Sequence, residues 1–355
     1  GRSVGPWLTA FAYGTSYFSA VVFVGYAGQF GYKYGLASTW IGIGNAVLGS
    51  LVAWVVLGRR TRIMSKHLGS MTMPDFFGKR YDSQSLRIAA SVIAFIFLIP
   101  YTASVYNGLS YLFGMAFNVD FRICVVVMAV LTGVYVIIGG YMATAWNDLI
   151  QGIIMLFGIV AVIAAVLSGH GGFMAAVKEL AQVPSSVMPG AYASFLGPDP
   201  ANLFGVVILT SLGTWGLPQM IQKFYAIKDE KAVHTGTIIS TLFAIVVSGG
   251  CYFLGGFSRI SGVKEAVDGT VKYDTIIPTM LSSLPDILIG IVIVLVLSAS
   301  MSTLSSLVLT SSSTLTLDFI KPLFVKKMNE KQQLVWMRVL LAGFILISVV
   351  IALDP

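Results

Sequence analysis

The stretch Thr210–Gln219, with the sequence TSLGTWGLPQ, lies in the middle of an apolar segment and contains two glycines and a proline. Proline removes a backbone donor and clashes with the preceding helical turn, so we expect a helix that breaks near Gly213, Gly216 and Pro218. Unwound backbone is tolerated at membrane depth only where it lines a cavity or an ion site. The stretch therefore predicts a helical membrane protein with a site at the break.

The composition supports a membrane protein. The chain has 355 residues, of which 56% are hydrophobic and only 10% are charged, and its mean hydropathy is +0.86. Soluble domains carry about 25% charged residues, so the outer surface of this chain must face lipid. This excludes a soluble enzyme and a nucleic-acid-binding domain, despite the net charge of +7. Cys124 and Cys251 lie in apolar runs and are interpreted as small hydrophobic residues.

A membrane-spanning helix needs about 20 consecutive residues without charge. Scanning for such runs predicts about nine spans: Pro6–Tyr32, Tyr34–Gly58, Ile88–Val119, Ile123–Asn147, Leu149–Gly169, Pro200–Gln222, Thr235–Ser258, Ile287–Leu317 and Val339–Leu353. The last run has 15 residues and is interpreted as a truncated or tilted span. The sequence thus predicts an all-α, multi-pass protein of the cell membrane.

The basic residues orient this bundle. If odd-numbered spans run outward, one side carries 16 of the 22 basic residues: Arg2, Arg59, Arg60, Arg62, Lys66, Lys79, Arg80, Arg87, Lys223, Lys228, Lys231, Lys321, Lys326, Lys327, Lys331 and Arg338. The other side carries the remaining six: Lys33, Arg122, Lys178, Arg259, Lys264 and Lys272. The positive-inside rule places the first side in the cytoplasm.

Span 1 has a weaker break signal of its own. Its middle, Ala12–Ala20, has the sequence AYGTSYFSA, in which Gly14 is followed by Thr15 and Ser16. Spans 1 and 6 are the first members of two five-helix halves, and interrupted spans at matching positions point to the binding site of a transporter with inverted repeats. The alternative is that these residues have no special role, because glycine and proline are common in transmembrane helices.

Span 8 carries a stripe of hydroxyl groups. Ala299, Ser302, Thr303 and Ser306 follow i, i+3, i+4, i+7 spacing and share one helix face, and Ser305 adds a further hydroxyl. A small hard cation such as sodium prefers oxygen ligands, and free carbonyls of an unwound span 1 would complete the set. Alternatively, the hydroxyls bond back to their own helix or allow close helix packing.

Asp148 is the remaining ionisable candidate, in the stretch Ala145–Gly152. It opens span 5, where it would either cap the helix and complement its dipole or act as a cation ligand. We expect no other acid and no histidine inside a span. A proton relay would then lack its parts, which favours sodium as the coupling ion. The solute would be recognised without a side-chain charge.

These residues resemble the sodium/solute symporter family over essentially the whole chain. The motifs that carry the resemblance are short: Gly1–Pro6, Met73–Phe77, Gly139–Gly140 with Trp146–Gln151, Gly216–Gln219 and Met301–Ser305. The resemblance implies a LeuT-type bundle in one transmembrane domain, residues 1–355, with a first repeat over 1–169 and an incomplete second repeat over 200–355. A helix before span 1, the tenth core helix and later helices are expected to be missing from this chain.

The resemblance also implies ion sites. The main sodium site would use Thr15 and Phe18 of span 1 with the Ala299 carbonyl and the hydroxyls of Ser302 and Thr303. A second sodium site would use four residues: Asp148, Ser302, Ser305 and Ser306. One sodium ion or two per transport cycle both remain open.

The two helix breaks imply a solute pocket, for which we predict eight residues: Tyr17, Ser19, Thr210, Thr214 and Trp215, with Tyr101, Ser104 and Asn107 of span 3 as its wall. Aromatic residues at these spacings are as often packing residues as recognition residues. Proline-type members of the family resembled here have an acidic residue where this chain has Tyr17, which argues against proline as the solute.

These features predict a sodium-coupled secondary active symporter that imports a small polar organic solute by alternating access. Its partners would be the solute, sodium ions and the lipid bilayer, with no nucleic acid. The alternative is a membrane-embedded solute sensor within a larger signalling protein. A simple channel is disfavoured by the paired breaks. An intramembrane enzyme is not expected, because the spans contain no acid–base or metal-binding cluster.

Overall fold

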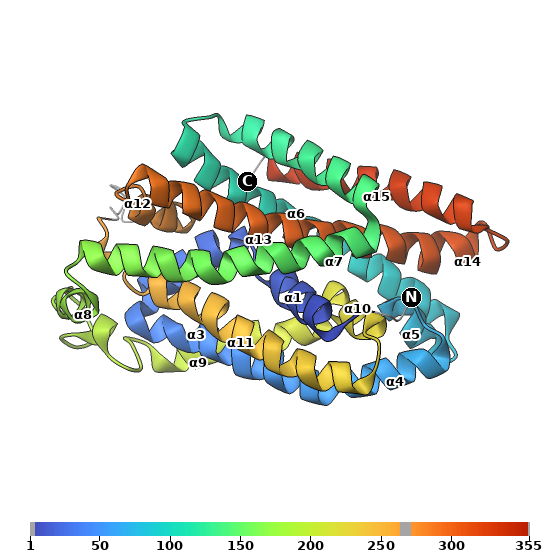
Figure 1. Cartoon of the computed structure of the whole chain (residues 1–355), viewed down its shortest axis with the longest axis horizontal. Coiled ribbons are helices and arrows are strands. Elements are labelled where there is room, and N and C mark those ends of the chain that lie inside the picture. The colour runs from blue at the N-terminus through green and yellow to red at the C-terminus, as the bar shows by residue number, and fades with distance from the viewer. Residues whose placement is uncertain (1–3, 263–270, 354–355) are drawn as a thin grey trace.

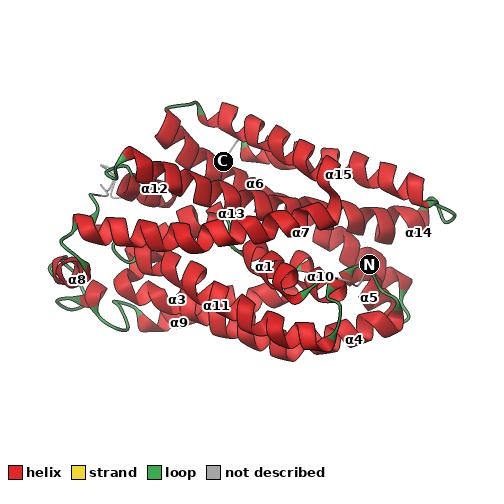
Figure 2. Cartoon of the chain, in the orientation of Figure 1, coloured by secondary structure: helices red, strands yellow, loops and turns green. Residues whose placement is uncertain are grey.

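The computed structural model describes residues 4–262 and 271–353, and the chain is 84% helical. Within these ranges there is no strand (Figure 2). Val4 and Ile227 form an isolated bridge. Arg2 and Lys264, and the beginning of the Gly1–Pro6 motif, lie outside the described residues. The predicted all-α bundle is confirmed.

The helices follow one another along the chain in this order: α1 (Pro6–Tyr17), α2 (Ala27–Tyr34), α3 (Thr39–Gly44), α4 (Arg59–Leu68), α5 (Met73–Arg80), α6 (Gln84–Phe117), α7 (Phe121–Gly169), α8 (Phe173–Ala181), α9 (Pro200–Gly213), α10 (Pro218–Ala226), α11 (Glu230–Gly255), α12 (Ile276–Leu281), α13 (Asp286–Thr314), α14 (Lys321–Leu323) and α15 (Glu330–Ala352). Helix α7 doubles back on itself and supplies two spans, Phe121–Ile138 and Thr144–Gly169 (Figure 1).

In the described part of the chain, seven helices are long and apolar enough to cross a membrane, or eight when the bent pair α9 and α10 is counted as one span. The sequence predicted about nine spans, so this count of seven or eight does not confirm the predicted number. Helix α1 has only 12 residues, and the second half of span 1 continues past a turn at Gly35, where φ is 60°, into span 2.

The helices form two groups with α1 between them (Figure 1). Helix α13 packs against α6, α7 and α15, whereas α11 packs against α2 and α3 on the other side. Helix α1 contacts α7, α11 and α13, so it lies where the two groups meet. A break in α1 is therefore open to residues from both groups.

Small residues allow the closest helix approach in the bundle. A Cβ atom at Gly31 of α2 would lie 2.1 Å from the Gly255 carbonyl of α11, so neither position accepts a side chain without backbone movement. Without a hydrophobic drive between helices in lipid, such close backbone packing holds them together. The contact anchors the second half of span 1 against α11.

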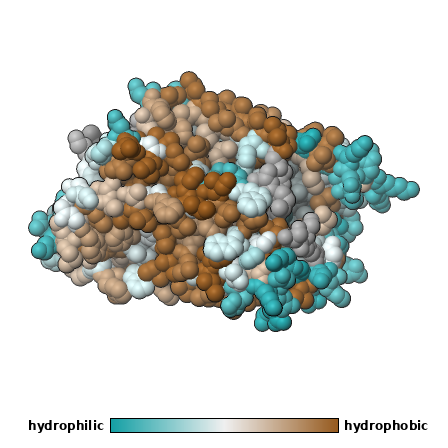
Figure 3. All heavy atoms as spheres, viewed as in Figure 1, coloured by the Kyte–Doolittle hydropathy of each residue, from teal (hydrophilic) through white to brown (hydrophobic). Residues whose placement is uncertain are grey.

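The surface separates an apolar belt from charged ends (Figure 3). Large apolar side chains point outward along the belt; Ile138 is 80% exposed and Phe157 is 75% exposed. Soluble monomers rarely expose large contiguous apolar surfaces, and the belt matches a lipid-facing surface. We call the end that carries α4, α5 and α14 the basic end; the positive-inside rule predicts that this end faces the cytoplasm.

Two predicted span limits are wrong. Helix α15 has 23 residues and includes Lys331 and Arg338, because its N-terminus is set by a capping box between Asn329 and Gln332 and not by the last charge. The helix of span 8 likewise continues beyond Leu317 through a π-helical segment, η9 (Leu315–Ile320). It therefore contains a second buried acid, Asp318, which the scan for charge-free runs excluded.

Candidate functional site

The break in span 1 lies at Phe18 and Ser19, just after the predicted Gly14–Ser16 signal. Helix α1 ends at Tyr17, and Phe18 adopts an extended conformation with φ −86° and ψ 118°. The chain becomes helical again at Ala20, whose N–H donates to Ser300 Oγ of α13 at 3.3 Å. Carbonyls in the last turn of a helix lack intrahelical partners, so this break turns free carbonyl oxygens toward α13.

The structure brings the hydroxyls of α13 onto these carbonyls. Thr303 Oγ1 donates toward the carbonyl oxygens of Thr15 and Phe18, at 3.1 and 3.0 Å. Ser302 Oγ lies 2.7 Å from Thr15 Oγ1. Ala299 is fully buried one turn earlier on the same face. Four of the five residues predicted for the main sodium site thus contact one another at the break, and Ala299 is buried on the same face of α13.

The chemistry of this cluster suits a small monovalent cation. The atoms that could coordinate a cation here are all oxygens, which hard cations prefer as ligands. The C-terminal end of a helix also carries the negative end of the helix dipole, and α1 ends at this cluster. Broken helices in transporters coordinate sodium through such unwound carbonyls and half-helix C-termini. The cluster needs no side-chain carboxylate for this role.

Asp148 is not a helix cap. It lies within α7, whose N-cap is Asp120, and only 1% of Asp148 is exposed. Ser302 Oγ donates to Asp148 Oδ1 at 2.6 Å. The capping interpretation is therefore wrong, and the carboxylate is linked to the main cluster through the Ser302 hydroxyl. The helix continues N-terminal to Asp148, so its backbone donors are already used inside the helix.

A lysine that we placed in a cytoplasmic loop completes this region. Lys223 lies in α10 and is 5% exposed. Its Nζ atom is 3.9 Å from Asp148 Oδ2 and donates to Ser306 Oγ at 3.2 Å. Ser306 Oγ also lies 2.8 Å from Ser16 Oγ of α1. The predicted placement of Lys223 in the loop after span 6 is therefore wrong.

One signal in the sequence could have found Lys223. Pro218 occupies the first turn of α10, which is the favoured position for proline at a helix N-terminus. A helix restarting at Pro218 at mid-membrane must continue for about two more turns to leave the hydrocarbon region. Lys223 falls inside those turns, whereas the charge-free scan ended the span at Gln222.

The break in span 6 forms as predicted. Helix α9 ends at Gly213, and α10 restarts at Pro218 with a bend of 51° between the two segments. Between them, Leu217 is extended, with φ −74° and ψ 119°. The proline ring prevents a continuous helix here, and the two broken spans lie on either side of the same small cavity.

Two of the eight predicted solute residues line this cavity. Tyr17 and Thr214 face it together with Asn45 and Phe243, and its volume is about 20 Å³. A space of this size accommodates about one water molecule, so the side chains close tightly around the two breaks in this conformation.

Two others line a separate cavity. Ser104 and Asn107 of α6 face a space of about 200 Å³ beside the second half of span 1, together with Asp274. Asp274 lies in a short 3₁₀ helix, η8 (Tyr273–Thr275), outside the candidate spans. Burial raises the pKa of the Asp274 carboxyl. This cavity lies at the end opposite the basic end.

The remaining four predicted solute residues are placed differently. Thr210 Oγ1 is 3.1 Å from Asn45 Oδ1, and Trp215 Nε1 donates to the Leu48 carbonyl at 2.9 Å; both bind span 2. Tyr101 lines an apolar cavity of about 530 Å³ near Pro218. Ser19 is fully buried, and its hydroxyl accepts from the N–H of Val21 at 3.3 Å.

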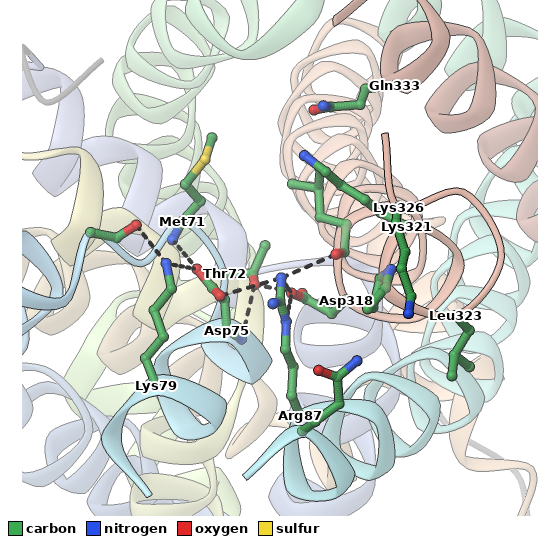
Figure 4. A pocket seen from close by; sticks show the side chains of 14 residues that line it. Met71, Thr72, Asp75, Lys79, Arg87, Asp318, Lys321, Leu323, Lys326 and Gln333 are labelled. Atoms are coloured by element: carbon green, nitrogen blue, oxygen red, sulfur yellow. Dashed lines mark hydrogen bonds and ion pairs between the residues drawn. The ribbon is translucent and has the colours of Figure 1, made fainter. Parts of the chain in front are cut away.

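A second cluster of buried charge lies at the basic end, beside a cavity of about 820 Å³ (Figure 4). Arg87 of α6 reaches between two carboxylates, with Nη2 2.8 Å from Asp318 Oδ1 and 3.3 Å from Asp75 Oδ1. Thr72 donates to Asp318 Oδ2 at 2.5 Å, and Lys79 pairs with Asp75 at 2.9 Å. This cluster joins the loop before α5 to the end of span 8.

Two interrupted helices that meet mid-membrane, with an oxygen cluster between one break and a neighbouring helix, define a secondary transporter of the broken-helix class. The chain belongs to the sodium:solute symporter family, whose profile matches residues 1–355. The chain is a sodium-coupled symporter, and none of these comparisons points to the signalling alternative.

The chain is similar to two curated transporters. It is 28% identical over 370 residues to the sodium/proline symporter of Salmonella typhimurium, covering 100% of this chain and 71% of that one. It is 28% identical over 334 residues to the sodium/pantothenate symporter of Haemophilus influenzae, covering 93% of this chain and 66% of that one.

Its fold is similar to a solved transporter. The structure of a Na⁺-coupled sialic acid symporter in a substrate-bound, outward-open state matches with a TM-score of 0.80 and 16% identity. The match covers 99% of this chain and 73% of that one. The LeuT-type fold class predicted from the sequence is confirmed.

Proposed function

We propose that the sodium ion of this symporter binds where α1 ends, at the carbonyls of Thr15, Phe18 and Ala299 and the hydroxyls of Ser302 and Thr303. The observation that carries this proposal is the Thr303 hydroxyl, which reaches the carbonyls of both Thr15 and Phe18. A cation at this point would hold the end of α1 against α13. Sodium binding would thereby order the break in span 1.

The proposed solute is a small polar organic molecule that binds between the breaks of spans 1 and 6. The walls of the small cavity offer hydroxyl, amide and aromatic groups from Tyr17, Asn45 and Thr214. The curated relatives named above transport proline and pantothenate, which are both small polar carboxylates. We propose a solute of that size range that passes through the protein chemically unchanged.

The solute pocket would draw on all eight predicted residues as the bundle changes conformation. In the described conformation they lie in separate places, and a cavity of about 20 Å³ at the breaks is too small for an organic solute. We propose that opening from the outer side joins this cavity to the space lined by Ser104 and Asn107.

The transport cycle follows from two halves that share the site. We propose that residues 1–169 and 200–355 belong to two inverted repeats within one transmembrane domain. Sodium entering down its gradient supplies about 2.3 kcal/mol per charge for every 100 mV of membrane potential. Coupling requires sodium to bind one conformation better than the other.

The test is uptake into proteoliposomes with an imposed sodium gradient, using a panel of amino acids, carboxylates and sugars. One solute should accumulate only when sodium is present outside. The double variant Ser302→Ala with Thr303→Ala should lose at least nine-tenths of the sodium-stimulated uptake, because the bridging hydroxyls are removed. Ser313→Ala is the matched control, since that hydroxyl bonds back to Thr310 on the same helix.

Unchanged sodium dependence in the double variant would contradict the proposed ion site. The control variant and the double variant should reach the membrane in equal amounts, which surface labelling measures. Uptake of every solute in the panel without sodium would contradict the coupled mechanism itself.

A further inference from the structure

Lys223 lies among the residues that the family resemblance implies for a second sodium site. That set comprises Asp148, Ser302, Ser305 and Ser306. The lysine comes from α10, beyond the break in span 6, whereas the carboxylate comes from α7 and the hydroxyls from α13. Helix α10 therefore brings an ammonium group to the place where α7 and α13 would supply the ligands of a second sodium ion.

The distances place the ammonium group between the oxygens of this set. Lys223 Nζ is 3.2 Å from Ser306 Oγ and 3.9 Å from Asp148 Oδ2. Among the described residues, Asp148 Oδ2 accepts no hydrogen bond. The Lys223 ammonium is the positive charge near this oxygen. Ser305 Oγ donates back to the Ser302 carbonyl at 2.9 Å and is already engaged within its own helix.

We propose that the ammonium group of Lys223 takes the place of a second sodium ion, so that this protein binds and moves one sodium ion for each solute. The proposal rests on the proposed function, because it presupposes the main sodium site. It assigns Lys223 as a residue that determines ion stoichiometry.

Charge balance supports this assignment. Asp148 and Lys223 are 1% and 5% exposed, so both charges are shielded from water. The single negative charge of Asp148 is already offset by Lys223. A sodium ion between Asp148 and Ser306 would lie within a few ångströms of the ammonium, and two like charges at that distance repel strongly in a medium of low dielectric constant.

The main site does not share this conflict. Its proposed ligands include the Thr15 and Phe18 carbonyls and the Thr303 hydroxyl, which contact one another, whereas the lysine contacts Ser306, about one turn farther along α13. Ser302 links the two regions, since its Oγ is 2.6 Å from Asp148 Oδ1 and 2.7 Å from Thr15 Oγ1. Asp148 thus orients a main-site hydroxyl while its other oxygen faces the lysine.

The test counts sodium ions bound by the purified full-length protein, with radioactive sodium as the only ligand. The wild type should bind one sodium ion per protein. Lys223→Gln removes the ammonium and leaves Asp148 without its counter-charge, so the count should rise to two. Lys228→Gln is the matched control, because Lys228 lies just beyond α10 with an exposed side chain, and its count should stay at one.

Two bound sodium ions in the wild type would overturn the proposal while leaving the main site intact. A count of one in folded Lys223→Gln protein would also overturn it. No sodium binding in the wild type would instead contradict the proposed main site. Should Lys223→Gln fail to fold, the wild-type count still decides, and the neutral double variant Lys223→Gln with Asp148→Asn should bind one ion.

Discussion

Asp148 and Asp318 are buried carboxylates on long membrane helices, but they are bound in different ways. Asp318 has close partners on both oxygens, with Arg87 at 2.8 Å and Thr72 at 2.5 Å. Asp148 has one close partner, Ser302 at 2.6 Å, and its second oxygen faces Lys223 at 3.9 Å. The first carboxylate is fully engaged by the protein, whereas the second retains bonding capacity.

The chemistry of the two cations explains the difference. The planar guanidinium of Arg87 presents several donors in a fixed arrangement and reaches both Asp318 and Asp75 (Figure 4). The ammonium of Lys223 is a compact charge. It donates a hydrogen bond to Ser306, whereas Asp148 lies beyond hydrogen-bond distance. The charges at the basic end are therefore joined by direct contacts, whereas Asp148, within the described part of the chain, keeps one oxygen without a hydrogen bond beside the proposed ion site.

The largest predicted effect is loss of stability at the basic end. Arg87→Ala would leave Asp75 and Asp318 facing each other without the guanidinium between them. Removing one partner of a buried ion pair typically costs about 3–5 kcal/mol, so the free energy of unfolding should fall by that amount. Thermal unfolding of the detergent-solubilised protein measures the change.

The control for this variant is Arg80→Ala, which removes an exposed arginine at the end of α5. Its melting temperature should stay within the error of the wild type. Equal stability of the Arg87 and Arg80 variants would show that the basic-end cluster does not hold α5, α6 and η9 together.

Double-mutant cycles compare the two ion pairs directly, and their expected effect is smaller. The Arg87–Asp318 pair should give a coupling energy of about 2 kcal/mol, because it combines charge with a short hydrogen bond. The Asp148–Lys223 pair should give about 1 kcal/mol, because 3.9 Å exceeds hydrogen-bond distance. Alanine at each position, singly and together, with unfolding as the readout, supplies the cycles; equal couplings would remove the distinction.

The smallest effect is expected for an exposed pair at the same end. Arg59 Nε is 2.6 Å from Glu230 Oε2, but these side chains are 68% and 52% exposed. Solvent-exposed pairs contribute about 0–1 kcal/mol, so Arg59→Ala should barely change the unfolding midpoint. A loss comparable to that of Arg87→Ala would mean that charge alone, and not burial, stabilises the basic end.

Much of the site could be predicted from local sequence. Pro218 with Gly213 and Gly216 breaks span 6 because proline cannot continue a helix. The spacing of Ser302, Thr303 and Ser306 on α13 follows from the helical period. These patterns depend on neighbours along the chain, so they remain valid whatever the helices pack against.

The errors share one cause. Ending each span at its first charge placed Lys223 in a loop and ended span 8 before Asp318, although both residues lie inside helices and are buried. A charge can enter a membrane bundle when a partner from another helix offsets it. Asp148 and Arg87 are those partners, and each is far from its charge in sequence.

The sequence by itself determined the membrane environment, the two helix breaks and the hydroxyl face, because hydropathy, proline chemistry and helical periodicity are local properties. Only the tertiary structure decided which oxygens meet at the end of α1 and which cation faces Asp148. Those contacts join α1, α7, α10 and α13, and they exist only once the helices have packed, since no local rule specifies which side chains meet across a bundle.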